Sequence, residues 1–349
     1  MAVDANGADL GPREVAAGAA LAAAAGVRVL LFGPAAEIGD AAGGAQVIDA
    51  PVSIAKSGDP ARAVRSSSDA SIVRAARAVA AGEAAALVSG GGTGAALAAG
   101  LFNVKRDRGI YRPALALPLP TPARALPVTL LDVGANTQAR PEHLVQFAFM
   151  GGAFAQVVLG IARPRVALLS NGEEAERGSE VVLSAHQELV RLARDHGGAA
   201  VGAPMDFAGN IEGDELVAGT VDVVVTDGFT GNVALKLIEG VSGTVLRAIR
   251  EVALASPRAR VGGALMRGAL REFRDSIDPE AQGGAYLLGL RALGVVPHGR
   301  FTRRGFAQAI MRADRGVRDD VVGRTHDVLE TAGALRSAPP AMHASAAAR

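Results

Sequence analysis

The chain has 349 residues, of which 49% are hydrophobic, 20% charged and 3% aromatic, and its formal net charge is +1. This length and apolar content suffice for one large core or two moderate ones, which excludes a disordered chain or a small disulfide-stapled domain. The 36 basic residues balance 35 acidic ones and Trp is absent, so we expect no nucleic-acid partner. The chain also lacks Cys, which excludes disulfides, thiolate metal sites and a cysteine nucleophile.

No run of about 18 apolar residues occurs, so we expect no membrane-spanning segment. The Ala-rich stretch 15–25 follows acidic residues and no basic region, so we interpret it as a packed helix and not as a signal sequence. A cytoplasmic protein is the simplest expectation, with membrane association considered below.

Short apolar runs alternate with helical patterns along the chain. The expected strands are 2–4, 27–32, 84–89, 128–133, 165–170, 199–202 and 221–226, and the expected helices are 13–25, 68–81, 94–103, 141–160, 180–195 and 231–250. This α/β alternation predicts an αβα sandwich with a mostly parallel sheet, in a single domain over residues 1–330. Five prolines make 112–127 an extended connection, and the Ala-, Ser- and Pro-rich segment 331–349 is expected to be a disordered tail.

The first glycine-rich turn, SGGGTGA at 89–95, follows an expected strand and opens a helix. Its glycines fit the dinucleotide fingerprint, but no acid stands at the end of a following strand where the fingerprint requires one. No Gly-Lys pair occurs either, which argues against nucleotide hydrolysis. Two alternatives remain: a tightly packed turn, or a phosphate cradle formed by Gly90, Gly91, Gly92, Thr93 and Gly94.

Three further turns follow expected strands. Asn136, Arg140 and His143 lie around a Gly-Ala-Asn turn, where turn formation and helix capping are the alternatives to function. Arg177 lies in the charged loop NGEEAERG, which suits either an anion contact or a solvated surface. Asp227 precedes Gly228 and could orient a substrate or cap the next helix. The six His residues have no metal-ligand spacing, so we expect no metal.

These segments resemble one family, the bacterial phosphate acyltransferases of phospholipid synthesis. The likeness includes GLFNVKRDRGIYRPALA from Gly100, ANTQARPEHLVQFAFMG from Ala135, DVVVTDGFTGNVALKLIEG from Asp222 and GGAYLLGLRALGVVPHG from Gly283. It implies a fold of the isopropylmalate-dehydrogenase and phosphotransacetylase type, a homodimer, no cofactor, and transfer of a fatty acyl group from acyl carrier protein to inorganic phosphate. The alternatives are an NAD-dependent dehydrogenase of the same fold and an inactive scaffold for lipid synthesis.

The resemblance also suggests roles for individual residues. Gly90 to Gly94 and Arg177 would hold phosphate, Asp227 would orient it or accept its proton, and Asn232 would stabilise the oxyanion. Further phosphate or substrate contacts are expected from Asp4, Asn136, His143, Thr230, Gly231, Lys236 and His298. Departures from the family pattern are Asn6, Ala8, Gly92 and Arg177; the last stands where the family has lysine, and arginine cannot act as a base near neutral pH.

The segment 244–274 contains seven Arg and two Glu around Ser256 and Pro257, which predicts a protruding basic helical hairpin. Its net charge of +5 suits anionic lipid, an acidic carrier protein, or a dimer arm, and all three alternatives stay open. The contact residues expected there are Arg247, Arg250, Leu254, Arg258, Arg260, Val261, Leu265 and Arg267.

Overall fold

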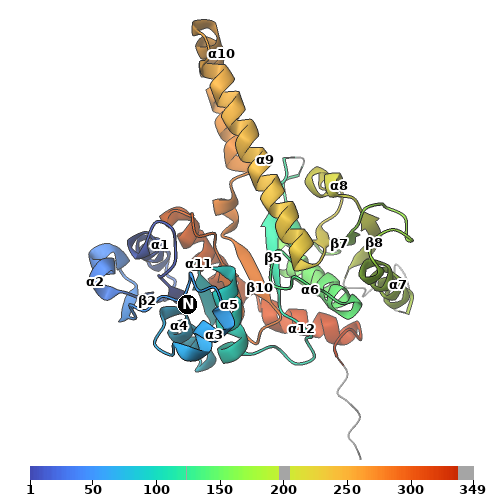
Figure 1. Ribbon diagram of the computed structural model, residues 1–349, viewed down its shortest axis with the longest axis horizontal. Helices are drawn as coiled ribbons and strands as arrows, with labels where there is room; N and C mark the ends of the chain where they lie inside the picture. Colours follow the sequence, from blue (N-terminus) through green and yellow to red (C-terminus); the bar gives the residue numbers. More distant parts are fainter. Residues whose placement is uncertain (123, 196–204, 337–349) are drawn as a thin grey trace, which may run out of the picture.

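A computed structural model describes residues 1–122, 124–195 and 205–336 of the chain. Its strands are β1 (Ala2–Asp4), β2 (Leu30–Gly33), β3 (Gln46–Asp49), β4 (Ala86–Ser89), β5 (Ala114–Leu119), β6 (Val128–Leu131), β7 (Arg165–Leu169), β8 (Asp206–Ile211), β9 (Val223–Val225), β10 (Ala285–Leu288) and β11 (Leu293–Val296). They form an 11-stranded sheet of order β3-β2-β1-β4-β11-β10-β5-β6-β9-β7-β8 (Figure 1).

The direction of the strands reverses in the middle of this sheet. β1, β2, β3, β4 and β11 pair in parallel, and so do β6, β9, β7 and β8. Between these two sets, β10 pairs antiparallel with β11 and with β5, and β5 pairs antiparallel with β6. Three reversals therefore make the two parallel sets run in opposite directions.

Helices cover both faces of the sheet (Figure 1). They are α1 (Pro12–Ala24), α2 (Ala35–Ile38), α3 (Pro60–Ser66), α4 (Ser71–Ala80), α5 (Thr93–Ala99), α6 (Pro141–Leu159), α7 (Glu180–Asp195), α8 (Gly213–Ala218), α9 (Gly228–Leu254), α10 (Pro257–Ser276), α11 (Arg303–Arg318) and α12 (Val321–Thr331), with the short helices η1 (Gly39–Ala42), η2 (Gly100–Val104) and η3 (Pro279–Gln282).

The core divides into two layers because side chains alternate along each strand. Val223 and Val225 of β9 join the layer that contains Phe147, Phe154 and Phe306 of α6 and α11. Val224 joins the other layer, with α4, α5 and the buried side of α9. The expected αβα sandwich is thereby confirmed.

The expected hairpin is formed by α9 and α10, which project from the body (Figure 1). The break falls at the predicted place, since Ser256 caps α10 and Pro257 is its first residue. α9 is longer than predicted, because it begins at Gly228 and ends at Leu254, and Ala234, Leu235 and Ile238 in its first half pack against the core. No helix among the described residues is long and apolar enough to cross a membrane.

Several elements differ from the predicted ones. β3, β8, β10 and β11 were not expected, and the proline-rich connection contains β5, whose Pro118 is tolerated within a strand of the sheet. The strand expected at 199–202 lies outside the described residues. The tail prediction is wrong for 331–336, because Ala332 is buried and the N–H of Arg336 donates to the Gly109 carbonyl at 2.8 Å. Residues 337–349 are outside the description.

Candidate active site

Asp4 ends β1 and is buried, with 2% of its surface exposed. Its carboxylate accepts hydrogen bonds from Ser71 Oγ at 2.6 Å and Ser89 Oγ at 2.7 Å, and from the Asn6 N–H at 3.2 Å. Burial raises the pKa of Asp4 to about 6, although these hydrogen bonds act in the opposite direction. Asp4 therefore ties β1 to β4 and α4 from beneath the glycine loop.

The glycine loop is packed against neighbouring backbone. A β-carbon on Gly91 would lie 2.6 Å from the Asn6 carbonyl oxygen, and one on Gly92, where φ is 121°, would lie 3.0 Å from that of Ala55. A β-carbon on Gly90 would lie 2.7 Å from the Phe306 ring, and one on Gly94 would lie 2.9 Å from the Pro60 ring. Close packing, one of the two alternatives, explains why these residues are glycine. Phosphate binding by Gly90 to Gly94 and the exposed Thr93 stays a prediction.

A pocket of about 790 Å³ opens beside this loop, between the turn after β1 and residues 53–67. Lys56 and Arg62 supply cations to it, and Ser53, Ser57, Ser66 and Ser67 line it with Asn6 to Asp9. The sequence reasoning missed this segment. The pair Asp59-Pro60 could have indicated a helix start there, because Asp is a common N-cap and Pro a common first residue of a helix. In the structure the Asp59 carboxylate caps α3 by accepting from the Arg62 N–H at 3.0 Å.

A second polar group surrounds Asp132 after β6. Asp132 is fully buried, and its carboxylate accepts from the N–H groups of Leu115, Gly134, Ala135 and Asn136 at 2.7–3.2 Å and from Asn136 Nδ2 at 2.9 Å. Asn136 Nδ2 also donates to the Pro113 carbonyl at 2.8 Å. Burial raises the pKa of Asp132, against the effect of these donors. The sequence reasoning did not select Asp132, although an Asp between a strand and a glycine turn was visible.

Asp227 caps α9 within this second group. One carboxylate oxygen accepts from the N–H groups of Phe229 and Thr230, both at 2.9 Å, and the other accepts from Thr230 Oγ1 at 2.7 Å. The Gly228 N–H donates to the Asn136 carbonyl at 2.7 Å, and Gly134 faces Asn232. The structure thus brings Asp132, Asn136, Asp227 and Asn232 together, and capping is the role that the Asp227 geometry favours.

Arg177 lies apart from both groups. Its side chain is 60% exposed and its Nε is 3.5 Å from Glu174 Oε2 in the same loop. Asn210 Nδ2 holds this loop by donating to the Glu174 carbonyl at 2.9 Å. Among the described contacts of Arg177, none reaches the glycine loop or Asp227.

The two candidate histidines differ in their surroundings. His143 is buried, its Nδ1 accepts from the Arg140 N–H at 3.2 Å, and burial lowers its pKa, so it acts as a helix cap. His298 follows β11, and burial lowers its pKa as well. Nearby charges act on His298 in both directions, since Arg300 and Lys236 lower its pKa further whereas Glu239 and Asp9 raise it. The Asp9 N–H donates to the Gly299 carbonyl at 2.8 Å, which places the turn after β1 next to His298.

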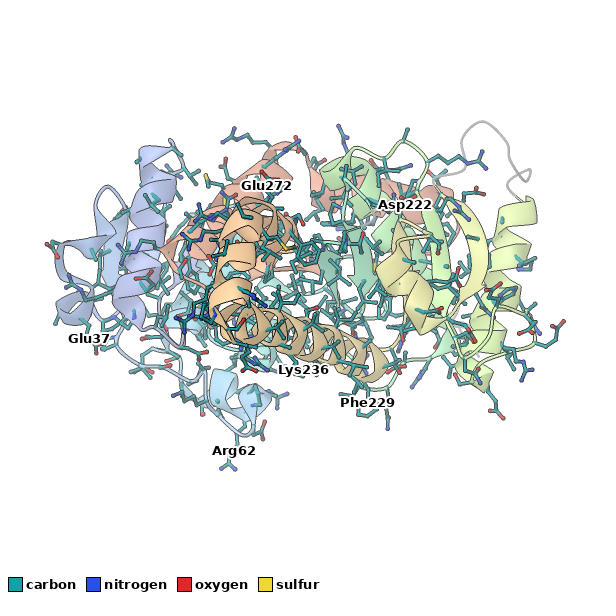
Figure 2. All side chains as sticks on the ribbon, turned by 90° about the horizontal axis from the view of Figure 1, so that it is seen from above. Glu37, Arg62, Asp222, Phe229, Lys236 and Glu272 are labelled. Atoms are coloured by element: carbon teal, nitrogen blue, oxygen red, sulfur yellow. The ribbon has the colours of Figure 1, made fainter. Side chains whose placement is uncertain are left out.

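The sheet order keeps the glycine loop apart from Asp227. β4 and β9 are separated by β11, β10, β5 and β6, which is roughly 24 Å at about 4.8 Å per step, and they run in opposite directions. The turns after β4 and β9 therefore do not lie at the same edge of one parallel sheet. α9 links the two groups instead, since it begins after Asp227 and carries Lys236 and Glu239, whose charges act on His298. Phe229 and Lys236 lie on the same side of α9 (Figure 2).

Comparison with known proteins agrees with this architecture and identifies the family. The sequence model of the family described as "Fatty acid synthesis protein" matches residues 1–324. A phosphate acyltransferase of Gloeobacter violaceus is 39% identical over 336 residues, which cover 94% of this chain and 96% of that protein. The phosphate acyltransferase of Pelotomaculum thermopropionicum is 42% identical over 331 residues, covering 93% and 92%. This chain belongs to the phosphate acyltransferase family.

Three further matches are either shorter or concern the fold alone. The phosphate acyltransferase of Thermobifida fusca is 48% identical over 219 residues, so the matched part spans 63% of this chain and 57% of that protein. A phosphotransacetylase from Streptococcus pyogenes has a TM-score of 0.58 at 17% identity, covering 90% of this chain and 93% of its own. The EutD phosphotransacetylase from Staphylococcus aureus has a TM-score of 0.56 at 18% identity, with the same coverage. The expected phosphotransacetylase-type fold is confirmed.

Asn6, one of the departures from the family pattern, is part of the Asp4 network of this phosphate acyltransferase. Its Nδ2 donates to Ser71 Oγ at 2.9 Å and to the Ala50 carbonyl at 3.1 Å. Because Ser71 also donates to Asp4, the substituted residue helps to fix the turn on which the glycine loop rests.

Proposed function

We propose that this protein transfers a fatty acyl group from acyl carrier protein to inorganic phosphate, giving acyl phosphate and free carrier protein for glycerophospholipid synthesis. The observation that carries the proposal is the match, over nearly the full length of both chains, to phosphate acyltransferases. In the reaction, an oxygen of monohydrogen phosphate attacks the thioester carbonyl and forms the new C–O bond. The C–S bond breaks, and the leaving thiolate takes up the proton that the phosphate carried. The absence of Cys supports direct attack, since no thioester can form on the protein.

The phosphate would bind where α9 approaches the glycine loop. His298 lies there next to the turn after β1, and its lowered pKa favours the neutral ring. The positive charges would come from Lys236 of α9, which acts electrostatically on His298, and from Lys56 and Arg62 of the adjoining pocket. These cations suit an anion better than the Asp132 group, where two carboxylates already occupy the nearby N–H donors. Thr93 and the loop Gly90 to Gly94 would form the adjacent wall.

Asp227 would act by positioning and not by removing a proton. Both of its oxygens already accept hydrogen bonds from the first turn of α9, which fixes Thr230, Gly231 and Asn232. Phosphate has ionised oxygens at neutral pH and is a nucleophile without a protein base. Asn232 would then donate to the developing oxyanion, a kind of contact that contributes about 3 kcal/mol in other enzymes.

A second copy of the chain would cover the exposed side of α9. Apolar residues recur there at intervals of four, which forms a single stripe along a helix. The stripe comprises Phe229, Val233, Leu237, Val241 and Val245, each at least half exposed. A stripe of this length on one subunit suits a homodimer in which two hairpins pack together.

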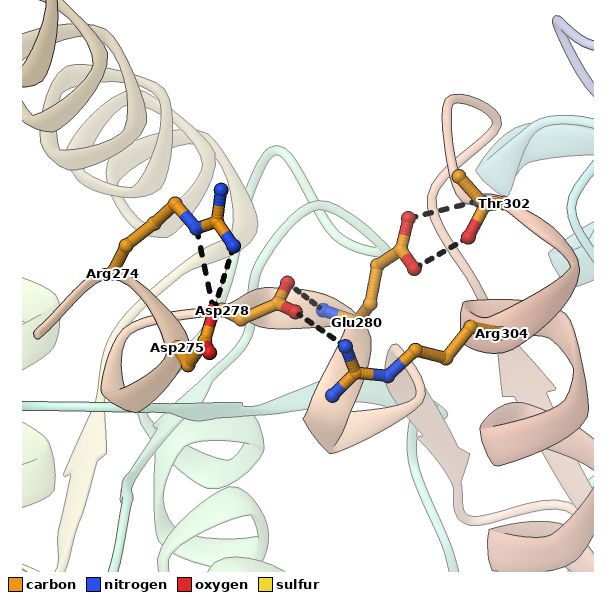
Figure 3. Close-up of polar contacts among 6 residues, drawn as sticks. All are labelled: Arg274, Asp275, Asp278, Glu280, Thr302 and Arg304. Atoms are coloured by element: carbon orange, nitrogen blue, oxygen red, sulfur yellow. Dashed lines mark hydrogen bonds and ion pairs between the residues drawn. The ribbon is translucent and has the colours of Figure 1, made fainter. Parts of the chain in front are cut away.

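The end of the hairpin would contact an anionic surface. Arg247, Arg250, Arg258, Arg260 and Arg267 are exposed near it, with Leu254, Val261 and the 83% exposed Leu265. Polar contacts hold the base of the hairpin, where α10 leads into η3 (Figure 3). Asp278 pairs with Arg304 at 3.9 Å, and the Glu280 carboxylate accepts from the Thr302 N–H at 2.9 Å and from the Thr302 hydroxyl at 2.8 Å. Anionic lipid and an acidic carrier protein remain the two candidates.

Flotation with anionic vesicles separates these two candidates. Wild type that floats, and an Arg258→Glu/Arg260→Glu variant that does not, would support the lipid. Wild type that stays at the bottom, together with loss of carrier-protein binding in the same variant, would support the carrier protein and reject the lipid.

The activity itself is tested by incubating the purified full chain with acyl-acyl carrier protein and phosphate and measuring free carrier thiol. We expect release that requires phosphate and is independent of nicotinamide. Release that depends on nicotinamide would favour the dehydrogenase alternative, and no release from a folded dimer would favour the inactive scaffold.

A further inference from the structure

A cavity of about 730 Å³ lies away from the proposed phosphate site, between η2, the loop that follows it and the end of α12. Its lining comes from four parts of the chain, namely Leu101, residues 105–110, Arg291, and His326, Glu330, Leu335 and Arg336 of the C-terminal region. The volume falls within the range of roughly 300–1,000 Å³ that is usual for small-molecule sites.

The lining has a clear excess of positive charge. Five cations, Lys105, Arg106, Arg108, Arg291 and Arg336, face two acids, Asp107 and Glu330. Asp107 is engaged by His326, whose Nδ1 is 2.7 Å from Asp107 Oδ2. Because the cations outnumber the acids and one acid already has a partner within the protein, the cavity favours an anion.

The cations fall into two kinds. The Arg106 guanidinium donates to the Ile110 carbonyl at 3.2 Å and to that of Tyr111, so it braces the loop. Lys105, Arg108 and Arg291 are exposed, and within the described chain no ion pair or side-chain hydrogen bond engages their charged ends. These three remain available to a ligand.

The loop is also held in a demanding backbone conformation. Lys105 has φ of 73°, which residues other than glycine rarely adopt. Its N–H donates to the Gly100 carbonyl at 2.8 Å, its carbonyl accepts from the Arg291 N–H at 3.1 Å, and the Arg336 N–H donates to the Gly109 carbonyl at 2.8 Å. Backbone contacts across the cavity thus fix its walls, which reduces the ordering cost of binding.

We propose that this cavity binds a small organic phosphate at a site separate from that of acyl transfer. Guanidinium groups bind phosphate oxygens in pairs, and Lys105 adds a point charge. Leu101, Ile110 and Leu335 offer apolar contacts to the organic part of the ligand.

The chain provides its own probe for this site. It has two Tyr and no Trp, and Tyr286 is buried in the core. Tyr111 adjoins the cavity, with the Arg336 guanidinium carbon 6.0 Å from its ring centre. Tyrosine fluorescence of the full chain, titrated with pyrophosphate, therefore reports the cavity, and the Tyr111→Phe variant identifies the signal that comes from it.

The decisive comparison is between wild type and Lys105→Glu/Arg108→Glu, with Arg28→Glu as a control on an exposed surface elsewhere. Calorimetry with pyrophosphate gives the Kd independently of fluorescence, and circular dichroism checks folding. In the double variant we expect the Kd for this site to rise by about tenfold or more, because like charges replace two cationic contacts, while the control retains wild-type binding. Arg291→Gln, a milder change, should weaken binding in the same direction.

Unchanged affinity in both the double variant and Arg291→Gln would overturn the proposal. Absence of a Tyr111-dependent fluorescence change together with absence of a second calorimetric site in wild type at millimolar pyrophosphate would also overturn it. These results are independent of acyl transfer, which is measured separately by thiol release.

Discussion

Gly231 of α9 lies so close to Asp132 that a β-carbon at position 231 would stand 2.0 Å from the Asp132 carbonyl oxygen. The neighbouring atom belongs to the backbone, so it cannot move away by a change of rotamer as the end of a flexible side chain could. The contact fixes the start of α9 against the turn that holds Asn136.

Gly231→Ala should therefore displace the start of α9. We expect a loss of about 2 to 3 kcal/mol in the free energy of unfolding, as for other overpacked sites, and a lower kcat. The matched control is Gly240→Ala in the same helix, where a β-carbon meets nothing within 4 Å. That variant should be stabilised by up to about 1 kcal/mol through helix propensity. Equal effects of the two substitutions in denaturant unfolding would contradict the contact.

Asp227→Asn distinguishes capping from proton transfer. Asn caps helices about as well as Asp, so stability and turnover should stay near those of wild type. Asp227→Ala should lose about 1 kcal/mol of stability through the missing cap, and kcat with it. The measurements are chemical denaturation and thiol release for both variants. A folded Asp227→Asn protein with kcat reduced about a hundredfold or more would show that the carboxylate takes the proton.

The variants Lys236→Gln and Arg177→Gln test which of these two cations contributes to phosphate binding. The charge of Lys236 lowers the pKa of His298, and the neighbouring Pro297 packs against Gly90 of the glycine loop. Arg177, in contrast, is exposed and pairs with Glu174. We expect Lys236→Gln to raise the KM for phosphate by about tenfold, which corresponds to the loss of one charge-assisted contact. Arg177→Gln should change it by less than about twofold. Steady-state kinetics with varied phosphate decides this, and the reverse order would relocate the phosphate to the Arg177 loop.

Asp4 should give the protein a particular dependence on pH. Its folded pKa is about 6, above the ordinary value of 3.8, so between these values the folded state keeps a proton that the unfolded state has lost. Stability from this group is therefore present at low pH and falls as the pH rises through this window, by about 3 kcal/mol for a shift of some two pKa units.

Asp4→Asn removes that titration while keeping the shape of the side chain. As the pH rises from 4 to 6.5, the Tm of wild type should fall relative to the Tm of the variant. Above pH 6.5 the difference between the two Tm values should stay constant. Thermal unfolding at matched pH values measures it, and Glu37→Gln, a change at an exposed carboxyl on α2, serves as the control. A difference that is constant from pH 4 to 6.5 would contradict the raised pKa.

Leu237→Glu tests the dimer. A carboxylate in the middle of the α9 stripe would have to be desolvated between two subunits, so we expect dissociation to a monomer. Leu10→Glu, at another exposed leucine outside the hairpin, should leave the assembly unchanged. Analytical ultracentrifugation gives the mass of each variant. A wild-type monomer, or a dimer that tolerates Leu237→Glu, would reject the proposed interface.

Local patterns were sufficient to predict much of the fold. The helix from Pro141 and the break at Pro257 follow from fixed proline geometry and from caps, which act over a few residues. The parallel strands near Val88 and Val224 follow from short apolar runs bounded by turn residues. Local signals also gave helix capping as one of the two interpretations of Asp227.

What the sequence by itself determined was therefore the kind of those elements that have a strong local pattern, the family, and the residues at the turns that follow them. Only the tertiary structure decided which turns meet, because strand order and direction depend on pairing between segments distant in the chain. The antiparallel strands β10 and β5 reverse the sheet between β4 and β9, and that reversal separates the glycine loop from Asp227. The connection between the two polar groups is therefore α9, which has Asp227 as its N-cap and carries Lys236 about two and a half turns later.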